Sequence, residues 1–380
     1  MYIQQKQLEK LKKESTPNKV VVIYGPRRCG KTTLLKKFIE YSADYIGDSY
    51  IFATAEDIIV NEILTSQSIV KLKNFIGNNK FLIIDEAQNI KNIGLNLKLI
   101  VDHIDGINVI ATGSSSFDLA GKLGEPLTGR KVSLKLFPLS QMEISSIEKG
   151  ADSLSNLENR LIYGSYPEVV VTEYNHKKEK YLKEITASYL YKDILILEGI
   201  KHSDKIVRLL QLLAFQIGQE VSLTELGTQL GISKNTVERY LDLLEKSFVV
   251  FKLMAFSRNL RKEISKSNRY YFYDNGIRNA LINNFNPINL RNDIGSLWEN
   301  YIIIERLKKQ EYMDIFSNNY FWRTYDKKEI DFIEERSGYL YGYEIKWGNR
   351  TKKVPKDWIN AYENASYEVI NKENYLNFIT

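Results

Sequence analysis

The chain has 380 residues, of which 43% are hydrophobic and 26% charged, as is ordinary for a soluble globular protein of two or three domains. No apolar run approaches a membrane span, the first residues contain no signal-peptide core, and one cysteine with three histidines leaves no disulfide and no zinc cluster. We therefore expect a cytoplasmic protein without a membrane partner. The net charge of +6 fits a nucleic-acid partner and an ordinary lysine-rich surface equally well.

The first predicted strand, at residues 20–23, runs directly into a glycine-containing loop and then a helix. The loop fits the pattern G-x-x-x-x-G-K-[ST] at every fixed position, from Gly25 to Thr32. Inward-pointing backbone N–H groups and the positive end of the helix dipole suit phosphates. The pattern predicts bound ATP and Mg²⁺, with Lys31 on the β- and γ-phosphates and the Thr32 hydroxyl on the metal. The loop residues expected to bind this cofactor are Gly25, Pro26, Arg27, Arg28, Cys29, Gly30, Lys31, Thr32 and Thr33.

Further buried strands are predicted along the first 140 residues, with helical stretches between them. Such a pattern predicts a parallel sheet with helices on both faces, and ligands bind these sheets at the carboxyl ends of the strands. The predicted strands lie at residues 50–53, 81–86, 109–114 and 132–136.

Two acids and a serine lie at those carboxyl ends. Asp85 is predicted to hold the Mg²⁺ shell through water, and Glu86 to polarise the attacking water; the alternative is that the pair caps the next helix. Ser114 is a candidate sensor of the γ-phosphate, or else one of a turn-forming run of serines.

Three arginines could act on phosphate. Arg130 is a candidate arginine finger, and Arg27 and Arg28 could touch phosphate or a neighbouring chain in a homo-oligomer. A solvated surface position is an equally good interpretation for each of them.

The middle of the chain is predicted to be helical. Residues 141–215 are interpreted as a helical lid without a residue that carries chemistry. Residues 216–285 contain two short helices and a strand in the order of a winged helix-turn-helix, which packs either on DNA or only on protein. The residues that would face DNA are Lys234, Asn235 and Arg239, and a following basic segment that includes Arg269 could contact phosphates or form a solvated loop.

The last predicted unit, residues 286–380, places charged residues on a helix and two strands. Glu299 lies on the helix, Asp331 on one strand, and Glu344 and Lys346 on the same face of the next. This layout is typical of a metal-dependent phosphodiesterase, in which Asp331 and Glu344 would bind Mg²⁺ or Mn²⁺ and Lys346 would orient the attacking water. The alternative is a buried salt-bridge cluster without catalysis.

The strings GPRRCGKTTLL, FLIIDEAQ and ATGSSS resemble those of AAA+-type P-loop ATPases. Others resemble prokaryotic ATPases fused to an uncharacterised C-terminal domain, which is similar to the restriction-endonuclease-like PD-(D/E)XK fold. These strings are LTGR, FPLS, YGSYPE, YYFYDNG, LWENYIIIER, FWRTYDKKEIDFI and YEIKWG. The resemblance implies the same roles for Lys31, Thr32, Asp85 and Glu86, and aligns Glu299, Asp331, Glu344 and Lys346 with nuclease-type positions.

The expected fold is therefore α/β, with an ATPase core at residues 1–140, the helical lid, the winged helix-turn-helix and the nuclease-like domain. The leading hypothesis is an ATPase whose hydrolysis cycle controls a DNA-acting C-terminal module, in one version a Mg²⁺-dependent nuclease. The alternative is a nucleotide-switched regulator that binds DNA or protein through an inactive nuclease-like domain. A motor that remodels protein is a third, weaker option.

Overall fold

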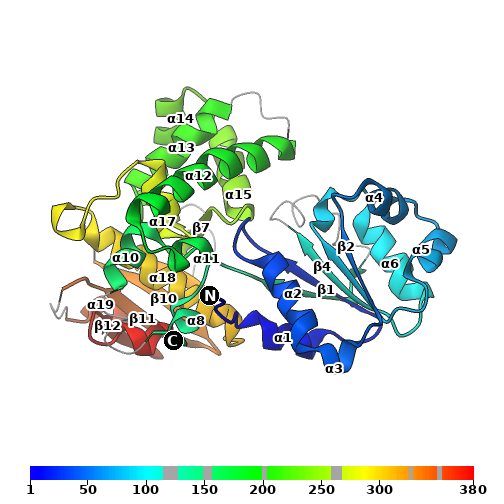
Figure 1. Cartoon of the computed structure of the whole chain (residues 1–380). Coiled ribbons are helices and arrows are strands. Elements are labelled where there is room, and N and C mark those ends of the chain that lie inside the picture. The colour runs from blue at the N-terminus through cyan, green and yellow to red at the C-terminus, as the bar shows by residue number, and fades with distance from the viewer. Residues whose placement is uncertain (114–126, 149–155, 199–202, 258–267, 325–327, 349–352) are drawn as a thin grey trace. The chain divides into compact units, whose positions relative to one another are not determined.

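The computed structural model describes residues 1–113, 127–148, 156–198, 203–257, 268–324, 328–348 and 353–380 (Figure 1). The chain divides into two compact units. The N-terminal unit comprises residues 2–138 and 246–248, and the C-terminal unit comprises residues 139–245 and 249–380 together with Met1. Each unit has its own sheet and its own hydrophobic core, so each is described by itself.

The N-terminal unit contains a five-stranded sheet in the order β2-β3-β4-β1-β5, in which every neighbouring pair is parallel. Its strands are rich in β-branched and other apolar residues and are largely buried, as expected of a sheet covered on both faces. They are β1 (Lys19–Tyr24), β2 (Tyr50–Thr54), β3 (Phe81–Asp85), β4 (Asn108–Gly113) and β5 (Lys131–Lys135).

Helices cover both faces of this sheet, and alternate residues of each strand pack on opposite helices. Val20 and Val22 of β1 pack with α4, α5 and α6, whereas Val21 and Ile23 pack with α1, α2 and α3. The helices are α1 (Gln7–Glu14), α2 (Lys31–Tyr41), α3 (Ala43–Ile46), α4 (Ile58–Thr65), α5 (Ile69–Ile76) and α6 (Ile93–His103), with a 3-10 turn η1 (Ala87–Asn89). The predicted α/β fold with a parallel sheet is thus confirmed.

The strand register brings three loops to one edge of the sheet. Tyr24 at the end of β1 pairs with Gly113 at the end of β4, and Ile84 near the end of β3 pairs with Ala111. The loop after β1, the acids that end β3 and the polar residues that end β4 therefore lie side by side, as the sequence predicts.

The C-terminal unit begins with a run of helices, after which strands and helices are interspersed along the chain. The helices are α8 (Gln141–Ile144), α10 (Leu157–Tyr163), α11 (Pro167–Val171), α12 (Asn175–Glu198), α13 (Ser203–Phe215), α14 (Leu223–Leu230), α15 (Lys234–Lys246), α17 (Asn275–Leu281), α18 (Ile294–Tyr312), α19 (Lys356–Ala361) and α20 (Tyr375–Ile379), with a 3-10 turn η3 (Ile288–Leu290). None of the helices in the described ranges combines the length and the apolar character needed to cross a membrane.

A seven-stranded mixed sheet organises this unit, in the order β12-β11-β10-β9-β7-β8-β6. The strands are β6 (Glu220–Val221), β7 (Val250–Ala255), β8 (Asn268–Phe272), β9 (Asn318–Arg323), β10 (Glu329–Arg336), β11 (Tyr339–Ile345) and β12 (Ala365–Ile370). Helices α18 and α20 pack on one face, and Trp358 of α19 packs on the other. Because β7 pairs with β9, the sheet runs without a break across the expected boundary at residues 285–286.

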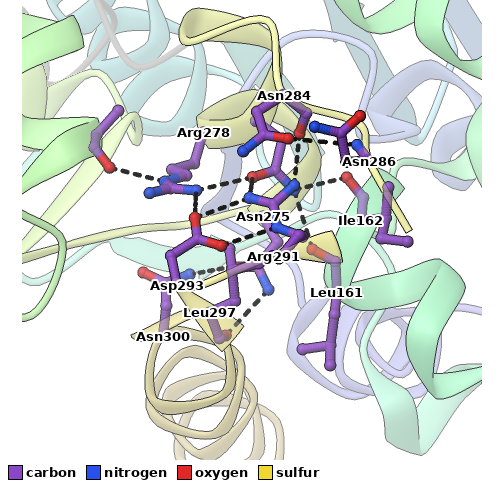
Figure 2. Close-up of polar contacts among 12 residues, drawn as sticks. Leu161, Ile162, Asn275, Arg278, Asn284, Asn286, Arg291, Asp293, Leu297 and Asn300 are labelled. Atoms are coloured by element: carbon purple, nitrogen blue, oxygen red, sulfur yellow. Dashed lines mark hydrogen bonds and ion pairs between the residues drawn. The ribbon is translucent and has the colours of Figure 1, made fainter. Parts of the chain in front are cut away.

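A buried polar network fixes the turn between α17 and α18 (Figure 2). Arg278 and Arg291 both contact the Asp293 carboxylate, and the Asn279 side chain accepts from both arginines. Asn279 also donates to the carbonyl oxygens of Leu161 and Ile162 on α10. The two cations and one anion are thereby paired and hydrogen-bonded, which is the condition under which buried charge is tolerated.

Candidate functional site

The phosphate-loop pattern lies between β1 and α2, and its first glycine is required by packing. A Cβ on Gly25 would clash with the carbonyl oxygen of Leu136, just beyond β5. Gly30, at the cap of α2, has φ +101°, in the left-handed region that favours glycine. The loop is thus shaped by its own scaffold before any phosphate binds.

Lys31 begins α2 and its side chain folds back over the loop. Its Nζ donates to the carbonyl oxygens of Gly25 (3.1 Å) and Pro26 (2.9 Å), and the residue is only 4% exposed. No carboxylate within the described ranges forms an ion pair with Lys31. A buried ammonium whose acceptors are two neutral carbonyls is well prepared to exchange them for phosphate oxygens.

Asp85 joins the three loops at this edge of the sheet. Thr32 Oγ1 on α2 donates to Asp85 Oδ2 over 2.7 Å, and Thr112 Oγ1 on β4 donates to Asp85 Oδ1. A hydroxyl and a carboxylate side by side are oxygen ligands of the kind that Mg²⁺ takes beside nucleotide phosphates. The residues present therefore fit the predicted metal, with Thr32 and Asp85 as its protein partners.

Glu86, the predicted base, adopts a left-handed backbone conformation with φ 55° and ψ 39°. Its N–H donates to Thr112 Oγ1 (3.1 Å) and to Asp85 Oδ1 (3.2 Å), which holds the turn in place. The carboxylate of Glu86 accepts a hydrogen bond from Gln88 Nε2. The sequence places Thr112, in the string ATGSSS, at this edge of the sheet without a role of its own, and it gives no signal for Gln88, in the string FLIIDEAQ.

Two glutamines, one just before α1 and one at its start, hold the phosphate loop and the end of β5. Gln5 Nε2 donates to the carbonyl oxygen of Cys29 (3.0 Å), and Gln7 Nε2 donates to that of Lys135 (2.8 Å). Cys29 itself is fully buried, and burial raises the pKa of its thiol, which donates to Leu136 O (3.6 Å). Cys29 thus contributes packing and a backbone carbonyl, and no sequence signal pointed to Gln5.

The other predicted loop residues are less deeply placed. Arg27 is half-buried, whereas Arg28 and Thr33 are exposed, and Arg28 has a positive φ of 59°. Ser114, the predicted γ-phosphate sensor, lies outside the described residues.

Arg130 lies at the opposite edge of the sheet from the phosphate loop. Val20 N, at the start of β1, donates to Arg130 O (2.9 Å), and the Arg130 guanidinium pairs with Asp102 of α6. β5 is parallel to β1 and Lys131 pairs with Val20, so Arg130 lies at the amino edge of the sheet, about 20 Å along the strand from Gly25 at 3.3 Å per residue. The structure therefore does not bring Arg130 to its own phosphate loop, and the arginine-finger prediction is restricted to a neighbouring copy.

The four predicted nuclease-type residues lie in one cluster in the C-terminal unit. Lys346 Nζ is 2.6 Å from Glu344 Oε1 and 3.5 Å from Asp331 Oδ2. Ile345 N donates to Asp331 Oδ2 (2.8 Å), and Tyr271 Oη donates to Glu299 Oε1 (2.7 Å).

Arg269 of β8 enters the same cluster. Its Nη1 is 3.8 Å from Glu299 Oε1 and 3.9 Å from Asp331 Oδ1, and its Nη2 donates to Glu329 Oε2 over 2.8 Å. Arg269 is 5% exposed, so the expectation that it lies in a basic, phosphate-contacting segment is wrong. The sequence could not show this, because the strand that carries Arg269 is buried only by the pairing of β8 with β7 and β6.

The electrostatics of the cluster show an excess of acid. Burial, with repulsion from Asp331, raises the pKa of Glu299 to about 8, and burial with repulsion from Glu344 raises that of Asp331. Burial alone would lower the pKa of Lys346, but Asp331 and Glu344 outweigh it and raise the value.

The cluster does not fit a metal ion as the structure arranges it. In the described ranges no group of three or more His, Cys, Asp or Glu side chains is disposed to hold one. Glu344 and Asp331, the predicted ligands, direct oxygens at Lys346, and Arg269 pairs with both Asp331 and Glu299.

Three protein families match successive parts of the chain. Residues 17–145 match the AAA domain, residues 154–288 match a domain of unknown function (DUF8612), and residues 294–376 match another domain of unknown function (DUF4143). Together with the loop geometry, the first match supports a P-loop domain of the AAA type in the N-terminal unit.

Two proteins are similar in sequence over most of the chain. An uncharacterised protein of Methanocaldococcus jannaschii is 27% identical over 371 residues, covering 92% of this chain and 79% of that protein. One of Haemophilus influenzae is 28% identical over 337 residues, covering 84% and 80%. The crystal structure of the Pif1 helicase from Candida albicans is similar over 49% of this chain and 48% of that one, with 14% identity and a TM-score of 0.29. A TM-score this low supports no inference about this chain.

Proposed function

We propose that the chain is an AAA-type ATPase that binds and hydrolyses ATP with Mg²⁺. The strongest support is that the hydroxyls of Thr32 and Thr112 both donate to the Asp85 carboxylate, and that Thr32 is next to the buried Lys31 in the chain. Lys31 would bind the β- and γ-phosphates, and Thr32 and Asp85 would hold the metal. Mg²⁺, when bound, neutralises charge on the transferred phosphate.

Glu86 is the proposed base. It follows Asp85 directly, its backbone is fixed by Thr112, and its carboxylate is partly exposed at the carboxyl edge of the sheet. A glutamate in this position can orient a water for attack on the γ-phosphate and accept its proton. The hydrogen bond from Gln88 must be exchanged for the one from that water.

The test of the ATP site uses two lysines of the same helix. Lys31→Ala removes the buried ammonium, and Lys36→Ala removes an exposed lysine of α2 as a matched control. We expect Lys31→Ala to lose binding of a fluorescent ATP analogue and Lys36→Ala to bind as the wild type does. Binding by Lys31→Ala at wild-type affinity would contradict the assignment.

We further propose that the ATPase controls a DNA-binding module in the C-terminal unit. The order α13, β6, α14, α15, β7 and β8, with β6 and β7 antiparallel to β8, supports a winged helix-turn-helix. Ser222 caps α14, Gly231 ends it in the left-handed conformation, and α15 exposes Lys234, Asn235 and Arg239. Helix α15 is the proposed recognition helix.

A salt series tests this module. The affinity for a short duplex should fall by about a decade per tenfold rise in salt for each phosphate neutralised. A Lys234→Ala, Arg239→Ala variant should bind more weakly and with a shallower slope, whereas Lys73→Ala on α5 should not. A flat salt response of the wild type would count against any DNA role.

Because Arg269 and Lys346 already pair with the carboxylates that would bind a metal, we propose that the C-terminal unit binds DNA without cutting it. The second candidate, a Mg²⁺-dependent nuclease, is favoured only by the convergence of Asp331, Glu344 and Lys346. Plasmid DNA incubated with Mg²⁺ or Mn²⁺, with and without ATP, should remain intact. Cleavage by the wild type that Asp331→Ala abolishes would establish the nuclease instead.

A further inference from the structure

We propose that Arg269 takes the place of a metal ion in the C-terminal carboxylate cluster, and that a neutral residue at this position turns the cluster into a divalent-metal site. The proposal is independent of the ATPase assignment, because every residue in it belongs to the C-terminal unit.

The position of the guanidinium is the first argument. Arg269 Nη1 lies 3.8 Å from Glu299 Oε1 and 3.9 Å from Asp331 Oδ1, so one guanidinium nitrogen pairs with both the helical and the strand carboxylate. A divalent ion bound by these two oxygens would need to lie 2.0–2.6 Å from each. The positive charge of a guanidinium within 4 Å of both oxygens repels such an ion, so Arg269 disfavours a metal at these two carboxylates.

The second argument is that Arg269 is held firmly. Its Nη2 donates to Glu329 Oε2 (2.8 Å), and its guanidinium carbon lies 4.5 Å from the centre of the Phe321 ring. Residues 269 and 271 point to the same face of β8, so Tyr271 can donate to Glu299 while Arg269 pairs with it. Planar guanidinium geometry suits such a site, where an aromatic face and several carboxylates surround one cation.

The third argument is the balance of charge. Four carboxylates, Glu299, Glu329, Asp331 and Glu344, lie around two cations, Arg269 and Lys346. If the positive charge of Arg269 is removed, Glu299 and Asp331 lose the guanidinium that pairs with both of them, which is costly in a low-dielectric interior. A divalent ion supplies the missing charge and prefers the oxygens that are exposed by the loss of the guanidinium.

The structural consequence concerns the whole sheet. Arg269 connects β8, near one end of the seven-stranded sheet, to β10 and to α18. The cluster therefore joins the proposed winged helix-turn-helix to the nuclease-like strands through an internal ion pair, and a metal is not needed for that connection.

The experiment uses the full chain without nucleotide and Mn²⁺ alone as the probe, with Thr32→Ala in every protein to weaken metal binding at the ATP site. The decrease in the electron paramagnetic resonance signal of free Mn²⁺ measures how many ions each chain binds. In the protein that retains Arg269, we expect no Mn²⁺ binding that is lost when Asp331 is replaced. Arg269→Gln should bind one ion per chain and melt at a higher temperature with Mn²⁺ than without it. Adding Asp331→Asn to Arg269→Gln should abolish both effects.

Two controls keep the test decisive. Arg269→Lys retains the charge and should bind no ion, and Arg269→Met, which keeps an apolar stem over Phe321, serves if Arg269→Gln does not fold. Asp331-dependent Mn²⁺ binding by the protein with Arg269 intact would overturn the proposal. So would a folded Arg269→Gln or Arg269→Met that binds no more Mn²⁺ than its parent.

Discussion

At the candidate ATP site, Glu86 has an uncommon, left-handed backbone conformation. A glutamate with φ 55° is uncommon, and such a conformation costs on the order of 1 kcal/mol or more unless its surroundings hold it. Here the hydroxyl of Thr112 and the carboxylate of Asp85 accept the Glu86 N–H. The turn at Glu86 follows β3 and is hydrogen-bonded to Thr112 at the end of β4. A base for the γ-phosphate would be needed at this edge of the sheet.

Substitution of Glu86 by Gln should separate binding from hydrolysis. The amide keeps the size of the side chain but cannot accept a proton, so ATP should bind with unchanged affinity. Hydrolysis should slow by about a hundredfold or more, the usual contribution of a general base. Phosphate release and nucleotide binding measured on the same preparation would check this. Wild-type turnover by Glu86→Gln would mean that another residue is the base.

Two glycines of the C-terminal unit are fixed by close contacts between elements. A Cβ on Gly276, at the start of α17, would overlap the Tyr163 carbonyl, and Gly164 has φ +75° against the Asp274 carboxylate. Asp274 caps α17 through Ile277 N (3.1 Å) and also accepts from Ser165 N (2.7 Å). The strings YGSYPE and YYFYDNG therefore meet in space, and the polar network around α17 (Figure 2) adds hydrogen bonds between α17 and α10.

The junction between α10 and α17 gives a matched pair of substitutions. Gly276→Ala should lower the free energy of unfolding by about 2 kcal/mol or more, because a backbone carbonyl must move to admit the methyl group. Gly295→Ala, in α18, should change it little or raise it slightly, since nothing lies within 4 Å of the added atom. Urea unfolding followed by far-UV circular dichroism would measure both. Equal effects of the two substitutions would contradict the packing at α17.

The same junction should make stability depend on pH. Burial raises the pKa of Asp274 to about 6, although Ser165 N–H and the Lys308 ammonium oppose it. The proton held by the folded state is worth up to about 3 kcal/mol, present in full below about pH 4 and lost as the pH rises through about 6. Asp274 lines a small pocket together with the charged side chains of Arg160, Glu305 and Lys308.

Asp274→Asn removes the titrating group and keeps a side-chain acceptor for the cap. The free energy of unfolding of the wild type, relative to that of Asp274→Asn, should therefore fall between pH 4.5 and pH 7.5. Denaturant titrations at several pH values would measure the difference. A difference that rises with pH would mean that the carboxylate is stabilised in its ionised form.

The sequence predicted the features that local pattern determines. The loop from Gly25 to Thr32, the acids after β3 and the parallel sheet all follow from short strings and strand periodicity. Long-range pairing decided the rest. The parallel pairing of β7 with β9 and the burial of Arg269 depend on segments dozens of residues apart, and no local signal marks them. The amino-edge position of Arg130 follows from the parallel direction of β5 and β1, which no short motif encodes.

The whole molecule combines an AAA-type unit with a second unit built on one continuous sheet. The proposed nucleotide chemistry belongs to the first unit, and the proposed DNA surface and the carboxylate cluster belong to the second. If ATP controls DNA binding, the two affinities must be coupled, and coupling is reciprocal: DNA must change the affinity for ATP by the same factor.

The most direct test of this account is the DNA affinity of Glu86→Gln, which should hold ATP without turnover, measured with ATP, with ADP and without nucleotide. The account predicts that the dissociation constants with ATP and ADP differ by about fivefold or more, the lower end of typical coupling. In Lys31→Ala, ATP should have no effect. DNA binding of Glu86→Gln that is identical in all three nucleotide states, while ATP is demonstrably bound, would contradict the coupling of the two units.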